Sequence, residues 1–177
     1  VSREDFSAVK QIEIDGVLNK KISIRALLVD HDRVWFSGNE NQYGFYNLKT
    51  KKVKIQSIPD TLKTEFRSIA KNKDAIFITN IGSPAGIYRI NKSDLKVEKV
   101  YTETHEKVFY DSMNFWNNDE GIVIGDPINN CLSIVITRDG GKSWQKISCE
   151  NLPKTAEGEA AFAASNTNVV IKGNHCW

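Results

Sequence analysis

The chain repeats one pattern of apolar and polar positions four times. Each copy has a short apolar run, then a polar turn of Asn, Asp or Lys, then a β-branched or aromatic run that ends near Gly or Asn. The copies begin at Arg25, Arg67, Ser112 and Ala160, and read RALLVDHDRVWFSGN, RSIAKNKDAIFITN, SMNFWNNDEGIVIGD and AAFAASNTNVVIKGN. Their starts lie 42, 45 and 48 residues apart. This spacing is typical of repeats with four strands per unit.

The rest of each complete unit predicts two more strands. YGFYNL and KVKIQSI follow the first copy, AGIYRI and KVEKVY the second, and CLSIVIT and SWQKIS the third. β-Branched and aromatic residues dominate these runs, and turn residues separate them. TLKTEFRSIAKNK would fit a helix if taken alone, but the repeat register predicts that it leads into a strand.

These elements predict an all-β fold, a partial β-propeller of about three and a half four-stranded antiparallel blades. The single domain, 1–177, has N-terminal strands in 1–24, then blades at 25–59, 66–101, 110–153 and, incompletely, 158–177. A β-sandwich also has closely spaced strands, but it does not require a repeat of this length. Closed propellers have about four to eight blades. We therefore expect either a parent of about seven blades, which we favour, or two copies that cover each other's open flanks.

A tight polar turn with a Trp behind it stands out in the third unit, in TRDGGKSWQKI. Asp139 is placed to accept hydrogen bonds from backbone N–H groups of the turn. Gly140 and Gly141 allow positive φ, and Ser143 can bond across the turn. Trp144 can cover it with a large apolar ring. Each residue has a local structural task, so the stretch predicts a hairpin connection and not a reactive loop.

The pattern T-x-D-x-G-x-S-W, carried by Asp139, Gly141, Ser143 and Trp144, resembles the Asp-box or bacterial neuraminidase repeat. That resemblance implies a turn at the blade periphery, away from the central cavity. The first two units have decayed versions, YNLKTKKVKI and YRINKSDLKVEKV, with a Val in place of the Trp. From about Tyr110 to Gly173, the chain also resembles propellers related to photosystem II stability and assembly factors. This wider resemblance implies a non-catalytic, exported protein with no defined ligand.

Composition excludes some partners. The net charge is +2, and Lys and Arg are spread along the chain, whereas a nucleic-acid binder typically has a clustered basic face. No apolar run approaches the roughly 18 residues of a membrane span, and the N-terminus lacks the features of a signal peptide. By composition the chain is either cytosolic or secreted and numbered after cleavage. We expect a protein or carbohydrate partner, no cofactor and no metal.

Three cysteines, Cys131, Cys149 and Cys176, leave at least one unpaired, and none has zinc-site spacing. The simplest interpretation is three small, half-buried residues. A Cys131–Cys149 disulfide is the alternative in an oxidising compartment.

A sialidase-like glycoside hydrolase is the alternative function. Sialidases of the known kind hold a carboxylate with three Arg and use a Tyr–Glu pair with an Asp acid. YRIN and FRSI come near the usual first-Arg motif but lack its Pro, and YRIN falls on a predicted third strand. Of six Arg, only Arg25 and Arg67 take equivalent positions near the start of an innermost strand. The sequence therefore favours a non-catalytic module.

The candidate binding residues are charged side chains at predicted ends of inner strands, where they would ring a central channel. They are Arg25, Arg67, Asp111, Asp126 and Glu159. For each, a plain solvated charge is the alternative, and Asp126 can equally begin the DPINN turn. Large aromatic residues on or near inner strands predict packing between blades rather than a sugar platform: Trp35, Phe77, Trp116 and Phe162. The three His are scattered, so we expect turns and no metal.

Overall fold

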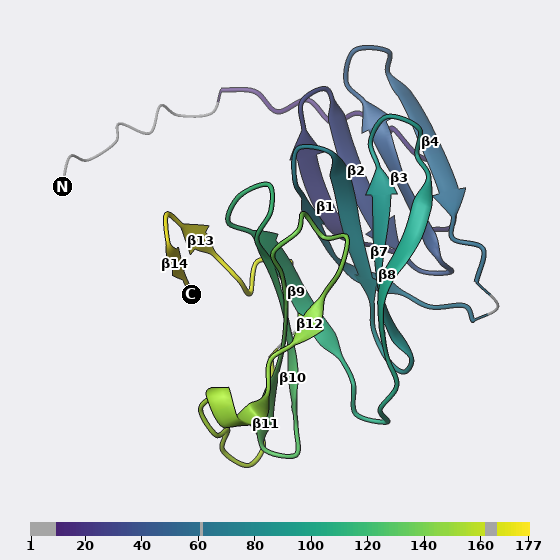
Figure 1. Ribbon diagram of the computed structural model, residues 1–177. Coiled ribbons are helices and arrows are strands. Elements are labelled where there is room, and N and C mark those ends of the chain that lie inside the picture. The colour runs from purple at the N-terminus through teal and green to yellow at the C-terminus, as the bar shows by residue number, and fades with distance from the viewer. Residues whose placement is uncertain (1–9, 61, 162–165) are drawn as a thin grey trace.

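The computed structural model describes residues 10–60, 62–161 and 166–177. Within this part, three four-stranded antiparallel sheets follow one another along the chain (Figure 1), each an up-and-down meander. The first comprises β1 (Ile24–Asp30), β2 (Arg33–Gly38), β3 (Gln42–Asn47) and β4 (Lys52–Ser57). The second comprises β5 (Phe66–Lys71), β6 (Ala75–Asn80), β7 (Ala85–Asn91) and β8 (Val97–Glu103). The third comprises β9 (Tyr110–Phe115), β10 (Gly121–Ile128), β11 (Cys131–Thr137) and β12 (Gln145–Lys146).

The first strands of the three sheets, β1, β5 and β9, lie side by side, and the sheets fan out from them. The predicted all-β fold is confirmed, and the helical element among the described residues is one short 3-10 turn, η1 (Cys149–Asn151). TLKTEFRSIAKNK leads into β5, as the repeat register predicted.

Asn and Asp side chains close the turns because their short polar groups accept backbone N–H groups of the bend. Asn47 accepts from Lys49 and Thr50, and Asn72 accepts from Asp74 and Ala75. The polar turn in each unit is thus the signal that separates its strands.

Two apolar clusters fill the spaces between successive sheets. Trp35, Phe45 and Ile78 belong to the cluster between the first and second sheets, and Phe77 and Val123 belong to the cluster between the second and third. Trp35 is 1% exposed and Phe77 is 0% exposed, so the predicted packing role of both aromatic residues is confirmed. Each sheet therefore buries one face against its neighbour, and the middle sheet buries both.

The chain ends differ from the expected pattern. Residues 10–23 form no strand, whereas the sequence predicted one or two strands in residues 1–24; residues 1–9 lie outside the described part. In the fourth unit, β13 (Ile171–Lys172) lies in the expected NVVIKGN strand but pairs with β14 (His175–Cys176) as a two-stranded hairpin. The expected AAFAAS strand is not seen at Ala160 and Ala161, and its residues 162–165, with Phe162, lie outside the described part.

Candidate functional site

The same β-bulge occurs near the start of each inner strand and carries a charged residue each time. The pairing of β1 with β2 skips Arg25, that of β5 with β6 skips Arg67, and that of β9 with β10 skips Asp111. A bulge leaves one residue out of the ladder and re-aims its side chain. Three of the predicted candidates are therefore structurally equivalent. We call the end of the blades that carries Arg25, Arg67 and Asp111 the rim.

Glu65 joins the two rim arginines. Its Oε1 atom lies 3.2 Å from Arg25 Nε and 2.5 Å from Arg67 Nε. The Arg25 side chain is 46% exposed, and those of Arg67 and Glu65 are 28% and 21% exposed. The guanidinium of Arg67 also lies 6.0 Å from the Phe109 ring centre, within cation–π range. The rim therefore has a fixed, partly solvated Arg–Glu–Arg bridge, whose Glu the sequence analysis missed.

Asp111 is the buried member of the rim. Its side chain is 0% exposed, and neither carboxylate oxygen has a hydrogen-bond donor among the described residues. Burial raises the pKa of Asp111 to about 7, and the neighbouring Asp126 carboxylate adds to the rise, while Arg67 and the backbone N–H of Asp126 oppose it. At neutral pH this carboxyl is therefore divided between its neutral and charged forms.

The other two candidates lie on the third sheet's side of the rim. Asp126 Oδ1 accepts a hydrogen bond from Ala161 N at 2.8 Å, which ties β10 to the later chain. Glu159 is exposed and accepts from Ala156 N at 2.6 Å in its own loop. The structure thus brings Arg25, Arg67, Asp111 and Asp126 into one cluster and leaves Glu159 as a separate surface charge.

A hollow of about 500 Å³ adjoins the Arg–Glu–Arg bridge. Glu65 lines it, together with Glu40, Lys63 and the half-buried ring of Phe109. The lining also includes residues of the β2–β3 and β6–β7 turns, so turns of the first two sheets and the linkers that precede β5 and β9 form the hollow. A concave surface with one aromatic ring and charges of both signs suits a polar partner.

Asn166 pairs with the free edge of β5, far from it in sequence. The Asn166 Oδ1 atom accepts from Ile69 N at 3.0 Å, and Asn166 Nδ2 donates to Ile69 O. The backbone oxygen of Asn166 accepts from the Ser112 hydroxyl of β9. One carboxamide therefore satisfies a backbone donor and acceptor of an inner strand, as a further strand would do.

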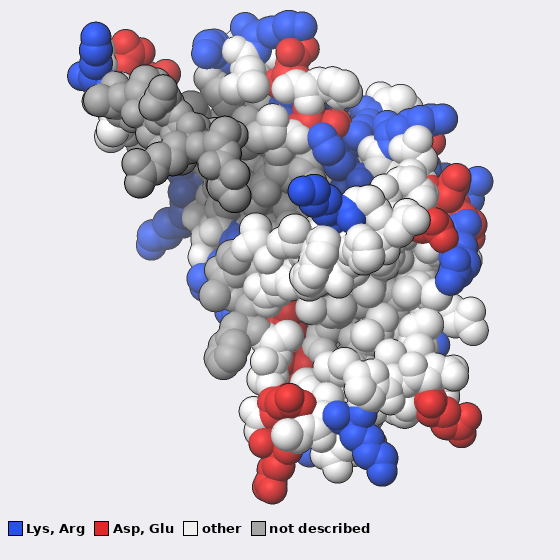
Figure 2. Space-filling view, turned by 90° about the vertical axis from the view of Figure 1, so that its left-hand side faces the viewer, with Lys and Arg blue, Asp and Glu red and all other residues white. Residues whose placement is uncertain are grey.

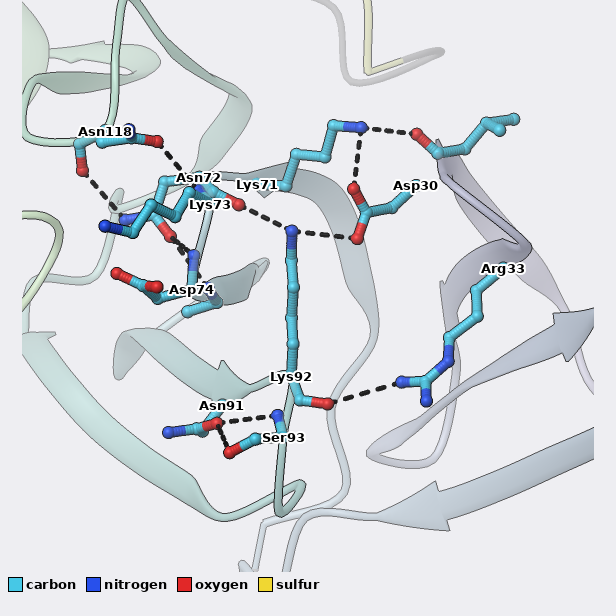
Figure 3. Close-up of polar contacts among 12 residues, drawn as sticks. Asp30, Arg33, Lys71, Asn72, Lys73, Asp74, Asn91, Lys92, Ser93 and Asn118 are labelled. Atoms are coloured by element: carbon cyan, nitrogen blue, oxygen red, sulfur yellow. Dashed lines mark hydrogen bonds and ion pairs between the residues drawn. The ribbon is translucent and has the colours of Figure 1, made fainter.

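A second polar network lies at the opposite end of the inner strands (Figure 3). Asp30 accepts from Lys71 at 3.0 Å and pairs with Lys92 at 2.9 Å, which joins the first sheet to the second. Asn72 donates to the backbone oxygen of Asn118 at 3.0 Å, which joins the second sheet to the third. Because both lysines are taken up in contacts between sheets, this network has a structural role and is no free anion site.

The predicted hairpin turn at Asp139 also lies at this end, away from the rim. The carboxylate accepts from Thr137, Ser143 and two backbone N–H groups at 2.6–3.0 Å. Burial alone would raise the pKa of Asp139, but these hydrogen bonds outweigh it and hold the pKa at about 2. Gly140 and Gly141 both have φ of +75°, and Trp144 packs on Phe77 and Phe115. Asp139, Ser143 and the two glycines have the local contacts that the sequence predicted, whereas the Trp144 ring packs in the apolar cluster between the second and third sheets.

The arginines do not assemble a sialidase-like carboxylate site in the described part of the chain. YRIN lies on β7, the third strand of its sheet, as predicted. Arg89 of this motif pairs with Glu98 at 3.6 Å, Arg33 lies 4.4 Å from the Phe45 ring centre, and Arg138 pairs with Glu120. Two arginines reach the rim, and they share one Glu.

The other residues that the sequence analysis singled out are Trp116 and the three cysteines. Trp116 is half-buried and lines a hollow beside the β13–β14 hairpin. Cys131 and Cys149 form a disulfide, the alternative that the sequence left open, and Cys176 is free and exposed. The described residues hold no group of three or more His, Cys, Asp or Glu side chains placed to bind a metal. Over the same residues, no helix has the length and apolar character needed to cross a membrane.

Comparison with solved structures decides the fold. The structure of U3-55K superposes with a TM-score of 0.58 and the WD40 repeats of RRP9 with 0.59, each at 10% sequence identity. The chain is a partial β-propeller. In both cases 81% of this chain is matched, but only 42% of the other chain, so it spans about two fifths of their length. The three sheets are accordingly propeller blades, and β1, β5 and β9 are their innermost strands.

No family model and no curated protein matches the sequence. The comparisons therefore support the propeller but not the finer resemblance to Asp-box proteins or to photosystem II assembly factors. At 10% identity the similarity concerns the fold alone, and function has to be argued from the rim.

Proposed function

We propose that this protein is a non-catalytic binding module that docks a protein partner on the rim of its propeller. The observation that carries the proposal is the equivalent bulge in all three blades, which gathers Arg25, Arg67 and Asp111 at one end. Glu65 fixes the two arginines in place, so little side-chain entropy remains to be lost on binding.

The chemistry of the rim favours a protein over a simple carbohydrate. Charges of both signs surround a hollow of about 500 Å³ in which Phe109 supplies the aromatic surface. Patterned charges of this kind select complementary charges on a partner and steer its approach. A sugar platform would need a more exposed aromatic face, and the large rings at Trp35 and Phe77 are buried between blades.

We further propose that the protein works in an exported, oxidising location. The Cys131–Cys149 disulfide supports this, because disulfides persist mainly outside the reducing cytosol. Alkylation of free thiols in intact cells of the source organism, followed by mass analysis, tests it. Recovery of Cys131 and Cys149 as alkylated thiols would contradict the proposal.

Affinity capture on the immobilised chain tests the binding function. Proteins from an extract of the source organism are quantified on the wild type, on Arg25→Glu/Arg67→Glu and on Lys142→Glu, an exposed charge at the opposite end of the blades. We expect a saturable partner that is lost from the double variant and kept by the control. A partner retained equally by all three chains would place binding elsewhere.

The glycoside hydrolase alternative has a direct test. We expect no turnover of an aryl-sialoside, because the two rim arginines share one Glu and a third arginine is not found beside them in the described residues. Turnover that is abolished by Arg67→Ala would replace the binding proposal with a catalytic one.

A further inference from the structure

Asp111 is a carboxyl at a position where the other two blades carry an arginine. Arg25 and Arg67 are the bulged residues of β1 and β5, and Asp111 is the bulged residue of β9. The two arginine side chains are 46% and 28% exposed, whereas Asp111 is 0% exposed. The third blade therefore has, at the equivalent position, an acidic group that is shielded from water.

The carboxyl of Asp111 is buried without the hydrogen bonds that would hold it in the ionised form. Neither of its oxygens accepts a hydrogen bond from the described residues. The backbone N–H of Asp126 lies nearby, but it donates to the backbone oxygen of Phe109 at 2.9 Å. Because a buried carboxylate without donors is unfavourable, this geometry favours the neutral form of Asp111.

The charged groups that act on Asp111 come from the two strands packed against β9. Arg67 on β5 attracts the ionised carboxyl, and Asp126 on β10 repels it. The attraction is weakened because Arg67 Nε already lies 2.5 Å from Glu65 Oε1. Burial first, and then Asp126, raise the pKa of Asp111 to about 7 against the opposing effects of Arg67 and the Asp126 N–H. The charge of Asp111 therefore changes near neutral pH, where most side-chain carboxyls stay ionised.

The charge of the rim cluster changes with the state of Asp111. Two arginines, Arg25 and Arg67, and two carboxylates, Glu65 and Asp126, balance one another. The cluster therefore has no net charge when Asp111 is protonated and one negative charge when it is ionised. Figure 2 shows one side of the molecule, on which charged side chains stand near the outline and the centre is largely uncharged. On this side, no dense layer of exposed charges masks a single charge at the rim.

We propose that Asp111 is a protonation switch that sets how strongly the rim binds an acidic segment of a partner. The switch rests on the binding function proposed above for the rim. When Asp111 is protonated, Arg67 and the more exposed Arg25 attract the acidic segment against Glu65 and Asp126 alone. When Asp111 is ionised, its charge also opposes Arg67 and repels the segment. Binding therefore weakens as the pH rises through neutrality.

Nuclear magnetic resonance on the full 177-residue chain tests the switch without a partner. The carboxyl carbon of Asp111 should titrate with a midpoint of about 7, and the Nε signal of Arg67 should shift with the same midpoint. The Arg67 shift should disappear in Asp111→Asn, which keeps the shape of the protonated carboxyl. Asp119→Asn is the matched control, because it removes one exposed carboxylate at the opposite end of the same blade. An Asp111 midpoint below about 5 would overturn the proposal, as would an Arg67 shift that persists in Asp111→Asn.

A fluorescently labelled hexaglutamate peptide tests the effect on binding. Its carboxylates are ionised at both about pH 6 and about pH 8, so fluorescence anisotropy at constant ionic strength reports changes in the protein. We expect wild type and Asp119→Asn to bind the peptide at least about threefold more tightly at the lower pH. Asp111→Asn should lose this difference and bind at the higher pH as the wild type does at the lower one. All three chains keep the three histidines, which also change charge near neutral pH, so the comparison isolates Asp111.

The two experiments separate failure of the switch from failure of the binding function. Equal pH dependence of peptide binding in Asp111→Asn and Asp119→Asn would overturn the switch. A peptide that binds the wild type at neither pH would count against the rim as a binding surface, and the Asp111 titration would still decide whether the switch exists. Circular dichroism at both pH values confirms that each variant is folded.

Discussion

At the scale of single residues, conformation and hydrogen bonding explain why particular amino acids stand where they do. Asp139 accepts four hydrogen bonds within one turn, and Gly141 sits where a Cβ atom would lie 2.2 Å from the Phe77 ring. Asp111 has the opposite situation, a buried carboxyl without a donor among the described residues. Three predictions follow from these environments.

Replacing Asp139 with Ala should lower the free energy of unfolding by about 1–2 kcal/mol, because two backbone N–H groups of the turn lose their acceptor. Partner binding at the rim should be unchanged, since the turn lies at the other end of the blade. Urea denaturation beside a binding titration checks both. Weakened binding at unchanged stability would show that the turn is a recognition site.

Replacing Gly141 with Ala should destabilise the protein more than the same change at Gly82. Both glycines have positive φ, +75° and +76°, so each substitution costs about 1 kcal/mol of backbone strain. A new Cβ atom at Gly141 would also collide with the Phe77 ring, whereas one at Gly82 would lie in open space. We therefore expect Gly141→Ala to lose about 1–3 kcal/mol more of the free energy of unfolding, because the site is overpacked. Thermal unfolding of the two variants gives the difference; equal losses would contradict the predicted conflict.

Stability should fall as the pH rises from about 4 to about 7. The pKa of Asp111 is 3.8 in its ordinary environment and about 7 when folded, so between these values the folded state binds more protons than the unfolded state. The protonated carboxyl therefore stabilises the folded state fully below pH 3.8, and this stabilisation is lost as the pH rises past about 7. We expect the free energy of unfolding to fall by about 2–4 kcal/mol over this range. In Asp111→Asn this slope should disappear. A variant that keeps the wild-type slope would assign it to another group.

At the scale of elements, the third blade differs from the others in how its last strand is held. β12 has only two residues, Gln145 and Lys146, whereas β4 and β8 have six and seven. The Cys131–Cys149 disulfide follows β12 directly and ties the chain back to the start of β11. A single covalent link thus replaces part of the missing strand pairing.

The double variant Cys131→Ala/Cys149→Ala should have a free energy of unfolding about 3 kcal/mol lower than the wild type. The two cysteines lie 18 positions apart in the sequence, so the disulfide closes a loop of about that size and restricts the unfolded chain. Reduction of the wild type should have the same effect. Guanidinium titrations with and without reductant measure it, and Cys176→Ala serves as the control. An effect of reductant on the double variant would point to Cys176 instead.

At the scale of the whole molecule, polar contacts between blades supplement the apolar clusters. Asp30 is 7% exposed and holds Lys71 and Lys92 of the next blade. Burial alone would raise the pKa of Asp30, but the two lysines together outweigh it and lower the pKa. This carboxylate therefore links the first blade to the second.

Asp30→Ala should cost about 3 kcal/mol of unfolding free energy, because it leaves Lys92, which is 17% exposed, without its carboxylate. Asp32→Ala is the matched control: it removes an exposed pair with Lys49 and should cost less than about 1 kcal/mol. Urea denaturation compares the two variants. Similar losses would show that Asp30 does not link the blades.

The sequence by itself determined the repeat, the strands and the turn chemistry. β-Branched and aromatic runs between Asn, Asp and Gly turns are local signals, and they placed all three blades and the hairpin turn at Asp139. They also placed Arg25 and Arg67 at equivalent positions, but they aligned Ser112 with these two arginines, whereas the β-bulges make Asp111 the third equivalent residue.

Only the tertiary structure decided which of these residues meet. Glu65 lies in a linker without a pattern of its own, and Asn166 reaches Ile69 across 97 residues, so no local signal marks either contact. The choice between a disulfide and free thiols at Cys131 and Cys149 depended on the 5.5 Å between their Cα atoms. The exposure of Leu27 and the burial of Ile69, which share one position in the repeat, differ because only the second has a blade in front of it.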